Sequence, residues 1–496
     1  MRQLQAAAAA IALTIAGTAV PAPTSGAPGA GDTYYPDYGN GGYDVSHYDV
    51  RLRYWPSDDR LAGTTTILAT AKQDLSSFDL DFVLDVSSVQ VNNRAAVFRR
   101  EGDHELVVAP AQPVTSGQQL TVVVTYSGVP STKKAEGVTA WIRTLDGAAA
   151  VGEPEEAWWW FPSNDHPSDK ATFDVSVMVP SDVQVISNGV QPRDPAPELL
   201  GWNRWYWRSA KPQATYLAFI TIGRYDITRS TAADGTPVIN AYSKLLPDDY
   251  ASAARASVER TAEITDWEVS KLGPWPFTAR GGVVAPPGAL GFALENQSRP
   301  NYSAAFFRSA ANPYVIVHEN AHQWFGDSVS VAQWKDIWLN EGFATYVQWL
   351  WSQEHGEGTA QELFDYTYAT ASADVWSTPP GDPGVARLFS DSVYDRGAMT
   401  LHQLRLAVGD DKFFAILRDW AAEHRYGNCT TAQFEALAER VSGKPLADMF
   451  QAWLYTPQKP AVATPAAKLA APVAAKLAAP VAPKSWSLIE QSHARH

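Results

Sequence analysis

The sequence has 496 residues, of which 45% are hydrophobic and 19% charged, and its formal net charge is −14 at pH 7. A chain of this length and composition is expected to form two or three globular domains, and it is too apolar to be intrinsically disordered. The negative charge, without any cluster of Lys and Arg, excludes a protein that binds along nucleic-acid phosphates.

The start of the chain predicts export from the cell. Residues 1–30 contain a short polar start with one arginine, the apolar run AAAAAIALTIAGTAV, and then small residues and prolines. This order is typical of a signal peptide, and the apolar run is too short for a comfortable membrane span. We expect a secreted protein without a membrane span in its mature form; the alternative is an alanine-rich start without regular structure.

Residues 31–231 have the pattern of a β domain. Apolar and polar residues alternate in short segments separated by Gly, Pro and Asp, for example in YDVSHYDVRLRYW, RLAGTTTILATA, ATFDVSVMVP and TYLAFITIGRYDI. Strict alternation is typical of strands with one buried face. The pattern predicts an N-terminal sandwich of antiparallel sheets.

Helical patterns dominate from residue 232 to residue 459. DDYASAARASVERTAEITDWEVSKLG predicts one long helix that Gly273 and Pro274 end. A second helix is predicted over ANPYVIVHENAHQWFG, because Asn312 is a favourable N-cap, Pro313 suits the first helical position and Gly326 suits the end. We therefore expect a multidomain α+β protein in which a mainly helical domain follows the sandwich.

Between these two helices, the segment PGALGFALENQ runs from apolar residues into Glu295. A carboxylate at the end of a buried strand is costly unless a positive group meets it. Either the chain or a ligand must therefore supply a positive partner for Glu295.

The helix YVIVHENAHQWF contains two histidines that lie on one helical face. Because His318 and His322 are four residues apart, both imidazoles can bind one Zn²⁺, and Glu319 lies beside them to activate a water molecule. If the next predicted helix packs antiparallel, Glu341 in WLNEGFATY completes a His₂Glu set with an open fourth position. An open position indicates a catalytic metal; the alternative is two core histidines and an unrelated glutamate.

Two features near the C-terminus have simpler interpretations. The single cysteine, Cys429, excludes an internal disulfide and is expected to be a small filler residue rather than a catalytic thiol. Residues 460–496 contain the sequence AAKLAAPV twice, at 466–473 and at 474–481. Such Ala/Pro/Lys sequence is typical of an extended spacer without a core to join, which could associate the protein with the cell envelope.

Two long segments carry a resemblance to a known family. HENAHQWFGDSVSVAQWKDIWLNEGFATY resembles the zinc segment of the aminopeptidase N family of gluzincin metallopeptidases, and EPEEAWWWFPSNDHPSDKATF resembles a region of that family's sandwich. The resemblance extends from about residue 43 to 460 and is greatest for exported actinobacterial members. It implies a thermolysin-like catalytic domain with one Zn²⁺ per chain, held by His318, His322 and Glu341, and Glu319 as general base.

The same resemblance assigns substrate contacts. GFALEN resembles the family's GAMEN motif, whose glutamate binds the free α-ammonium of a peptide, and that glutamate is Glu295. The resemblance implies that Glu153 is a second carboxylate at the amine and that Tyr394 donates to the oxyanion. Further substrate contacts are implied for Ala293 and Asn296. Phe292 and Leu294 replace the glycine and methionine of the motif, which leaves the contact to the substrate backbone open.

The sequence therefore predicts a secreted, monomeric zinc aminopeptidase that uses metal-activated water and acts on peptides with a free N-terminus. One alternative is a gluzincin endopeptidase, which would need no amine site; Glu295 and Glu153 argue against it. Another is a non-catalytic peptide-binding protein on the same scaffold, against which Glu319 and Tyr394 argue. Asp336 is expected either to orient a metal ligand or to interact with a helix N-terminus.

Overall fold

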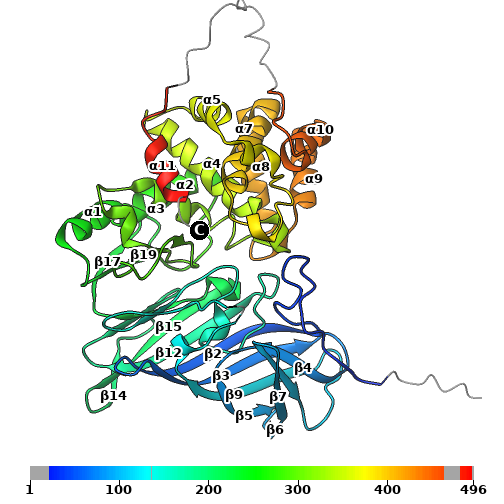
Figure 1. Cartoon of the computed structure of the whole chain (residues 1–496), viewed down its shortest axis with the longest axis vertical. Coiled ribbons are helices and arrows are strands. Elements are labelled where there is room, and N and C mark those ends of the chain that lie inside the picture. Colours follow the sequence, from blue (N-terminus) through cyan, green and yellow to red (C-terminus); the bar gives the residue numbers. More distant parts are fainter. Residues whose placement is uncertain (1–21, 136, 463–480, 494–496) are drawn as a thin grey trace, which may run out of the picture.

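The computed structural model describes residues 22–135, 137–462 and 481–493. A β domain lies beneath a mainly helical domain, so the expected fold class is confirmed (Figure 1). Residues 1–21 of the expected signal peptide and residues 466–480 of the two repeats lie outside the described residues. No helix of the described part has both the length and the apolarity to cross a bilayer.

The β domain is built on an eight-stranded sheet. Three of its strands coincide with segments predicted from alternation, because one side of each strand faces the sandwich core. In sheet order, the strands are β14 (Ala196–Leu199), β15 (Trp202–Gln213), β12 (Ala171–Pro180), β2 (Tyr43–Trp55), β3 (Arg60–Ala71), β9 (Gln119–Gly128), β5 (Asp85–Val91) and β6 (Arg94–Ala95).

Two smaller sheets complete the β domain. The first has the order β1 (Thr24–Ser25), β4 (Leu75–Asp81), β8 (Glu105–Ala109), β7 (Val97–Glu101), and the second β10 (Trp141–Arg143), β11 (Ala148–Ala150), β16 (Ile220–Gly223), β13 (Gln184–Ser187). The tryptophans of the WWW triplet, Trp158, Trp159 and Trp160, are buried in the core of this domain.

The β domain differs from the sequence prediction at three points. The pairs β2–β12 and β1–β4 are parallel, so the sandwich is not purely antiparallel. β1 includes residues assigned to the signal peptide 1–30, and Thr24 N donates to Asp74 O at 3.0 Å. The segment β17 (Tyr225–Thr231) pairs with the helical domain's sheet, so that domain begins near residue 225 rather than 232. Alternation identifies a buried face, but it does not identify a strand's neighbour.

The helical domain opens with a five-stranded sheet in the order β17, β18 (Pro237–Ser243), β19 (Arg280–Val284), β21 (Asn301–Tyr302), β20 (Ala293–Leu294). The single long helix expected over 248–273 is two helices, α1 (Asp248–Val258) and α2 (Thr261–Leu272). The remaining helices are α3 (Pro313–Ala321), α4 (Trp338–Glu354), α5 (Ala360–Thr370), α6 (Ala373–Ser377), α7 (Gly397–Val408), α8 (Asp410–Glu423), α9 (Thr431–Ser442), α10 (Ala447–Phe450) and α11 (Trp486–His493).

The signals at the start of α3 are confirmed. The side chain of Asn312 accepts hydrogen bonds from the backbone N–H groups of Tyr314 at 3.0 Å and Val315 at 3.4 Å. Pro313 occupies the first helical position, where no N–H is needed. α3 itself ends at Ala321, earlier than the predicted stop at Gly326, and His322 is its C-cap.

The end of the chain corrects the prediction of a tail without a core. α11 packs against α3, and its residue Ile489 is only 1% exposed and belongs to the core of the helical domain. The helix is drawn in red beside α3 and α4 in Figure 1. The low-complexity composition of the preceding repeats concealed this segment, because one short amphipathic helix gives a weak periodic signal.

Two glycines allow α4 and α7 to pack closely. A Cβ added to Gly342 would lie 2.8 Å from Cα of Gly397, which is closer than side-chain carbons normally approach backbone. Gly342 directly follows Glu341, so this contact also fixes the position of the glutamate. The close packing of α4, which carries Glu341, against α7 therefore depends on glycine at positions 342 and 397.

We predict that Gly342→Ala destabilises the protein by about 1–3 kcal/mol, because the two backbones must separate to admit the methyl group. Thermal unfolding of the metal-free protein measures this effect. Gly291→Ala is the control, since nothing lies within 4 Å of a Cβ there. Equal melting temperatures for the two variants would contradict the proposed close contact.

Candidate metal centre

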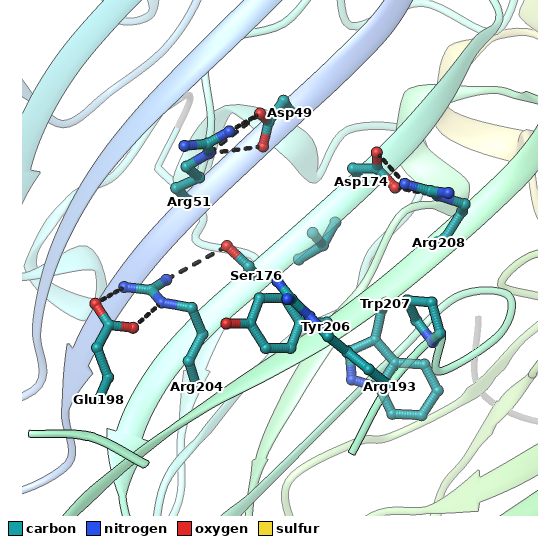
Figure 2. A pocket seen from close by; sticks show the side chains of 12 residues that line it. Asp49, Arg51, Asp174, Ser176, Arg193, Glu198, Arg204, Tyr206, Trp207 and Arg208 are labelled. Atoms are coloured by element: carbon teal, nitrogen blue, oxygen red, sulfur yellow. Dashed lines mark hydrogen bonds and ion pairs between the residues drawn. The ribbon is translucent and has the colours of Figure 1, made fainter. Parts of the chain in front are cut away.

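The β domain has a surface groove that is separate from the predicted metal ligands. It has a volume of about 550 Å³ and lies over β2, β12 and β15 (Figure 2). Three of its arginines are paired within the groove, Arg51 with Asp49, Arg204 with Glu198, and Arg208 with Asp174, while Arg193 lies over the ring of Tyr206. Most of these charges neutralise one another, and none of the predicted site residues lines the groove. The groove is therefore a poor candidate for a catalytic site.

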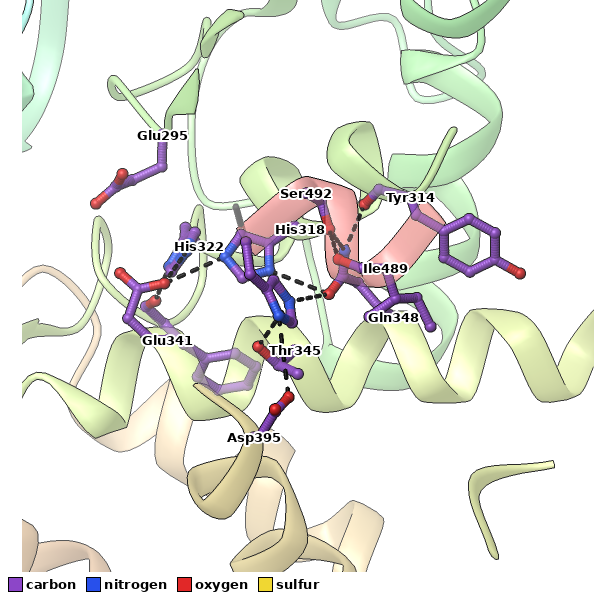
Figure 3. Close-up of polar contacts among 12 residues, drawn as sticks. Glu295, Tyr314, His318, His322, Glu341, Thr345, Gln348, Asp395, Ile489 and Ser492 are labelled. Atoms are coloured by element: carbon purple, nitrogen blue, oxygen red, sulfur yellow. Dashed lines mark hydrogen bonds and ion pairs between the residues drawn. The ribbon is translucent and has the colours of Figure 1, made fainter. Parts of the chain in front are cut away.

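The three predicted metal ligands come together between α3 and α4. Nε2 of His318 lies 3.2 Å from Oε2 of Glu341, and Nε2 of His322 lies 3.3 Å from the same oxygen (Figure 3). All three side chains are buried. The predicted antiparallel return of Glu341 to the histidine pair is therefore present in the fold.

The outer nitrogen of each histidine is held by a hydrogen bond. Nδ1 of His322 donates to the backbone oxygen of Phe325 at 3.0 Å, and Nδ1 of His318 donates to Oε1 of Gln348 at 3.3 Å. Both Nδ1 atoms therefore carry protons, since a carbonyl oxygen only accepts. In the neutral imidazoles this leaves the lone pairs on the Nε2 atoms that face Glu341.

The charges of the three ligands depend on one another. Burial opposes ionisation of Glu341, but His322 and His318 outweigh that effect and hold the pKa of Glu341 well below its ordinary value. Burial also opposes a charge on His322, yet Glu341 and Glu295 raise the pKa of His322 well above its ordinary value. His322 and Glu341 therefore stabilise each other's charged forms.

The spacing and chemistry of the three ligands suit zinc. Zinc binds imidazole nitrogen and carboxylate oxygen at about 2.0–2.2 Å, so neighbouring ligand atoms in a tetrahedral site are about 3.4 Å apart. The measured separations of 3.2 and 3.3 Å are close to that value. A second cluster in the sandwich, of Asp81, His104 and Glu105, is wider, with both His–carboxylate separations at 3.7 Å.

Glu319 and Tyr394 lie next to the ligands. Neither carboxylate oxygen of Glu319 has a hydrogen-bond partner among the described residues, and burial raises its pKa well above the ordinary value. Tyr394 lies in the π-helical turn Ser392–Arg396 before α7, with its ring stacked 6.0 Å from that of His318. Burial, together with nearby carboxylates, raises the pKa of Tyr394, so its hydroxyl remains a donor.

Glu295 and Glu153 reach the centre from different domains. Glu295 follows edge strand β20, is 1% exposed and accepts a hydrogen bond from the hydroxyl of Tyr216 at 3.1 Å. Glu153 precedes the WWW triplet in the β domain, and both of its buried carboxylate oxygens lack partners among the described residues. Burial, then the charge of Glu295, raises the pKa of Glu153. The two predicted amine-binding carboxylates are therefore close enough to repel each other.

Other predicted residues have their polar atoms engaged elsewhere. The amide of Asn296 donates to Leu217 O at 3.3 Å and accepts from Asn301 at 2.8 Å, so its role as a substrate contact stays a prediction. Ala293 in β20 pairs with Tyr302 in β21, and the contact of Ala293 with the substrate likewise stays a prediction. Asp336 accepts from the N–H and hydroxyl of Thr431 at the start of α9, which corrects the expectation that it orients a metal ligand.

Sequence analysis missed three residues that hold the site together. Gln348 binds His318, and Tyr216 binds Glu295. Gln323 donates from Nε2 to the backbone oxygen of Glu295 at 2.7 Å, which ties the strand of Glu295 to the end of the metal-binding helix. Gln348 lies two turns after Glu341 on the same helix, and that spacing could have identified it; nothing in the sequence marks Tyr216.

Two family models match the chain. The model described as the Peptidase M1 N-terminal domain matches residues 45–217, and that of the Peptidase family M1 domain matches residues 299–453. Together they span most of the described fold and include all three metal ligands.

Curated relatives and solved structures give the same result. Aminopeptidase M1-A of Oryza sativa subsp. japonica is 25% identical over 446 residues, covering 82% of this chain and 49% of the relative. Aminopeptidase M1 of Arabidopsis thaliana is 25% identical over 458 residues, covering 84% and 50%. The chain thus spans about half the length of the curated relatives it matches.

Among solved structures, the M1 zinc metallopeptidase from Deinococcus radiodurans superimposes with a TM-score of 0.76 at 27% identity, covering 90% of this chain and 100% of that chain. A mutant of that enzyme bound to the peptide Tyr-Ser-Ala gives a TM-score of 0.78 at 27% identity, covering 88% and 99%. The two-domain arrangement of this chain is therefore shared with a zinc metallopeptidase over the whole length of that enzyme.

We predict that the purified protein holds one zinc per chain and that Glu341→Ala abolishes zinc binding, because two imidazoles alone lack the third ligand. Elemental analysis after dialysis measures the stoichiometry. The matched control is Glu105→Gln in the wider cluster, which should keep its zinc. Zinc retained by Glu341→Ala and lost from Glu105→Gln would place the metal in the β domain instead.

Proposed function

This chain belongs to peptidase family M1, and on that premise we propose that it is a zinc aminopeptidase that removes residues from the free amino end of peptides. The proposal extends from relatives named as aminopeptidases and from the neighbouring enzyme whose mutant binds Tyr-Ser-Ala. It rests on one observation above all, the accumulation of buried carboxylates without matching cations.

Few positive charges lie near the four glutamates of the centre, which are Glu153, Glu295, Glu319 and Glu341. Among the described residues, none of the four forms an ion pair with Lys or Arg, and the histidine pair supplies the nearest positive charge. One zinc ion would balance the metal-binding part of this set. Glu295 and Glu153 would then still need a cation, and a substrate ammonium supplies one through charge-assisted hydrogen bonds.

The residues of the chain divide the chemistry of hydrolysis between them. When bound, zinc would supply a Lewis acid at the three ligands. Glu319 accepts the proton of the attacking water and passes it to the leaving amine, as a general base and then a general acid. Its unpartnered, buried carboxylate is suited to this exchange, because no internal hydrogen bond has to break first.

Tyr394 and β20 act on the peptide itself. The protonated hydroxyl of Tyr394 donates to the oxygen of the scissile carbonyl as negative charge develops there. β20 is an edge strand, so an extended peptide can align beside Ala293 and place its first residue against Glu295. An amine held at Glu295 would direct the first peptide bond toward Glu319.

The amine site separates this proposal from a gluzincin endopeptidase, which would cut internal bonds and have no use for two buried carboxylates beside the metal ligands. We further propose that the protein is exported and acts as a monomer. Export follows from the signal-like residues 1–30, and the C-terminal repeats are compatible with association with the cell envelope.

We predict that Glu319→Gln lowers kcat by roughly a hundredfold or more while the zinc content stays at the wild-type level, because the amide cannot accept a proton. Hydrolysis of aminoacyl chromogenic substrates, with elemental analysis of the same samples, provides the measurement. Glu268→Gln, a buried glutamate on α2, is the matched control and should retain turnover. Wild-type turnover in Glu319→Gln would rule out this base.

We predict that N-acetylation of a peptide abolishes its cleavage, since the blocked amine carries no charge for Glu295 and Glu153. Glu295→Gln should lower kcat/KM for the free peptide by roughly 10- to 100-fold, which corresponds to the loss of one charge-assisted bond of about 1.5–3 kcal/mol. Mass spectrometry of the products of one peptide in free and acetylated form tests both statements. Internal cleavage of the acetylated peptide at a comparable rate would favour the endopeptidase.

A further inference from the structure

The terminal helix α11 is docked beside the metal-binding helix at several points. Ile489 is buried in the core, and the backbone oxygen of Leu488 accepts from the side chain of Asn312, the N-cap of α3, at 3.3 Å. Directly before α11, the hydroxyl of Ser485 lies 2.8 Å from that of Ser352 on α4. α11 is therefore fixed to both helices that carry metal ligands.

The last turn of α11 reaches Gln348, the residue that holds His318. Oε1 of Gln348 accepts from Nδ1 of His318 at 3.3 Å and from Nε2 of His493 at 2.8 Å. Its Nε2 donates to Tyr314 O at 2.9 Å and to the hydroxyl of Ser492 at 2.6 Å (Figure 3). A side-chain amide has two acceptor and two donor positions, so all are used, and α11 provides two of the four partners.

These bonds determine the orientation of the Gln348 amide. Because Tyr314 O can only accept, the NH₂ group of Gln348 must face it, and Oε1 must face the two histidines. Each histidine must then present an N–H to that oxygen. The arrangement places the Nδ1 proton on His318 and leaves its Nε2 lone pair directed at Glu341 and the metal position.

The ring of His493 also packs on the residues of the site. It stacks on Tyr394 with ring centroids 5.1 Å apart and an interplanar angle of 30°, and its centroid is 5.3 Å from that of His318. The hydroxyl of Thr345 lies 3.3 Å from its Nε2, and a carboxylate oxygen of Asp395 lies 4.0 Å from its Nδ1. His493 thus contacts Tyr394 and His318 without belonging to the ligand set.

We propose that α11 is a positioning element of the metal centre: Ser492 and His493 fix the amide of Gln348, and through it the metal ligand His318. The proposal rests on the zinc site of the proposed function but not on its peptide specificity. Loss of such an outer hydrogen bond typically lowers metal affinity 10- to 100-fold. Zinc affinity can be measured without any peptide, so this proposal and the amine-binding proposal fail in different experiments.

The experiment compares two substitutions of His493 in the full-length protein. His493→Gln keeps an N–H donor but loses the ring, whereas His493→Phe keeps the ring but loses the donor. Zinc affinity is measured by competition with a chromogenic chelator. We expect His493→Phe to bind zinc at least about tenfold more weakly than wild type, and His493→Gln to stay within about threefold of it.

A second pair of variants tests whether His493 acts through Gln348. Gln348→Met should weaken zinc binding to the same extent as His493→Phe, and the double variant should be no weaker than Gln348→Met alone, since both remove one linked contact. Gln491→Ala, on the exposed side of α11, is the control and should bind zinc normally. Thermal unfolding of each zinc-free variant verifies that the domain is folded.

Three results would overturn the proposal. Wild-type zinc affinity in His493→Phe would show that the hydrogen bond does not hold the ligand. Weaker zinc binding by His493→Gln than by His493→Phe would assign the effect to packing of the ring rather than to the hydrogen bond. Faster peptide cleavage by His493→Phe at unchanged zinc affinity would show that α11 covers the site and has to move away from it.

Discussion

The contact between one carboxylate oxygen of Glu341 and the Nε2 atoms of two histidines is the interaction on which the rest of the structure depends. Three polar groups are removed from water at this point, and they are stabilised by one another and by the outer hydrogen bonds of the histidines. Such a set is costly to bury unless it is well paired or binds a cation. The fold around it serves to hold these three atoms at separations close to those of tetrahedral zinc ligands.

The surrounding elements supply that precision from every side. Gly342 and Gly397 allow α4 to lie against α7, so that Glu341 faces α3. Gln323 ties the backbone at Glu295 to the metal-binding helix, and the β domain supplies Glu153 on the loop before the WWW triplet. The site is therefore assembled at the junction of two domains, and neither domain contains a complete set of its residues.

An excess of buried negative charge explains why the site has two positive partners in the proposed reaction. Burial, and then repulsion from Glu295, raises the pKa of Glu153, while the histidines hold the pKa of Glu341 low. In the proposed reaction, Glu341 faces a metal, and Glu295 and Glu153 face an ammonium group. Glu295, at the end of an apolar run, needs a positive partner. In the proposed function, the substrate is that partner.

The sequence by itself determined the local features whose physical causes lie within a few residues. Alternation placed β2, β3 and β12, capping signals placed the start of α3, and the four-residue spacing put His318 and His322 on one helical face. Only the tertiary structure decided what depends on distant segments. It places β17 in the helical domain's sheet and Asp336 at the start of α9. It also places α11, which follows the low-complexity repeats in the sequence, in contact with Gln348. Periodicity reports which face of an element is buried, whereas the partner on that face is selected by packing and hydrogen bonding along the whole chain.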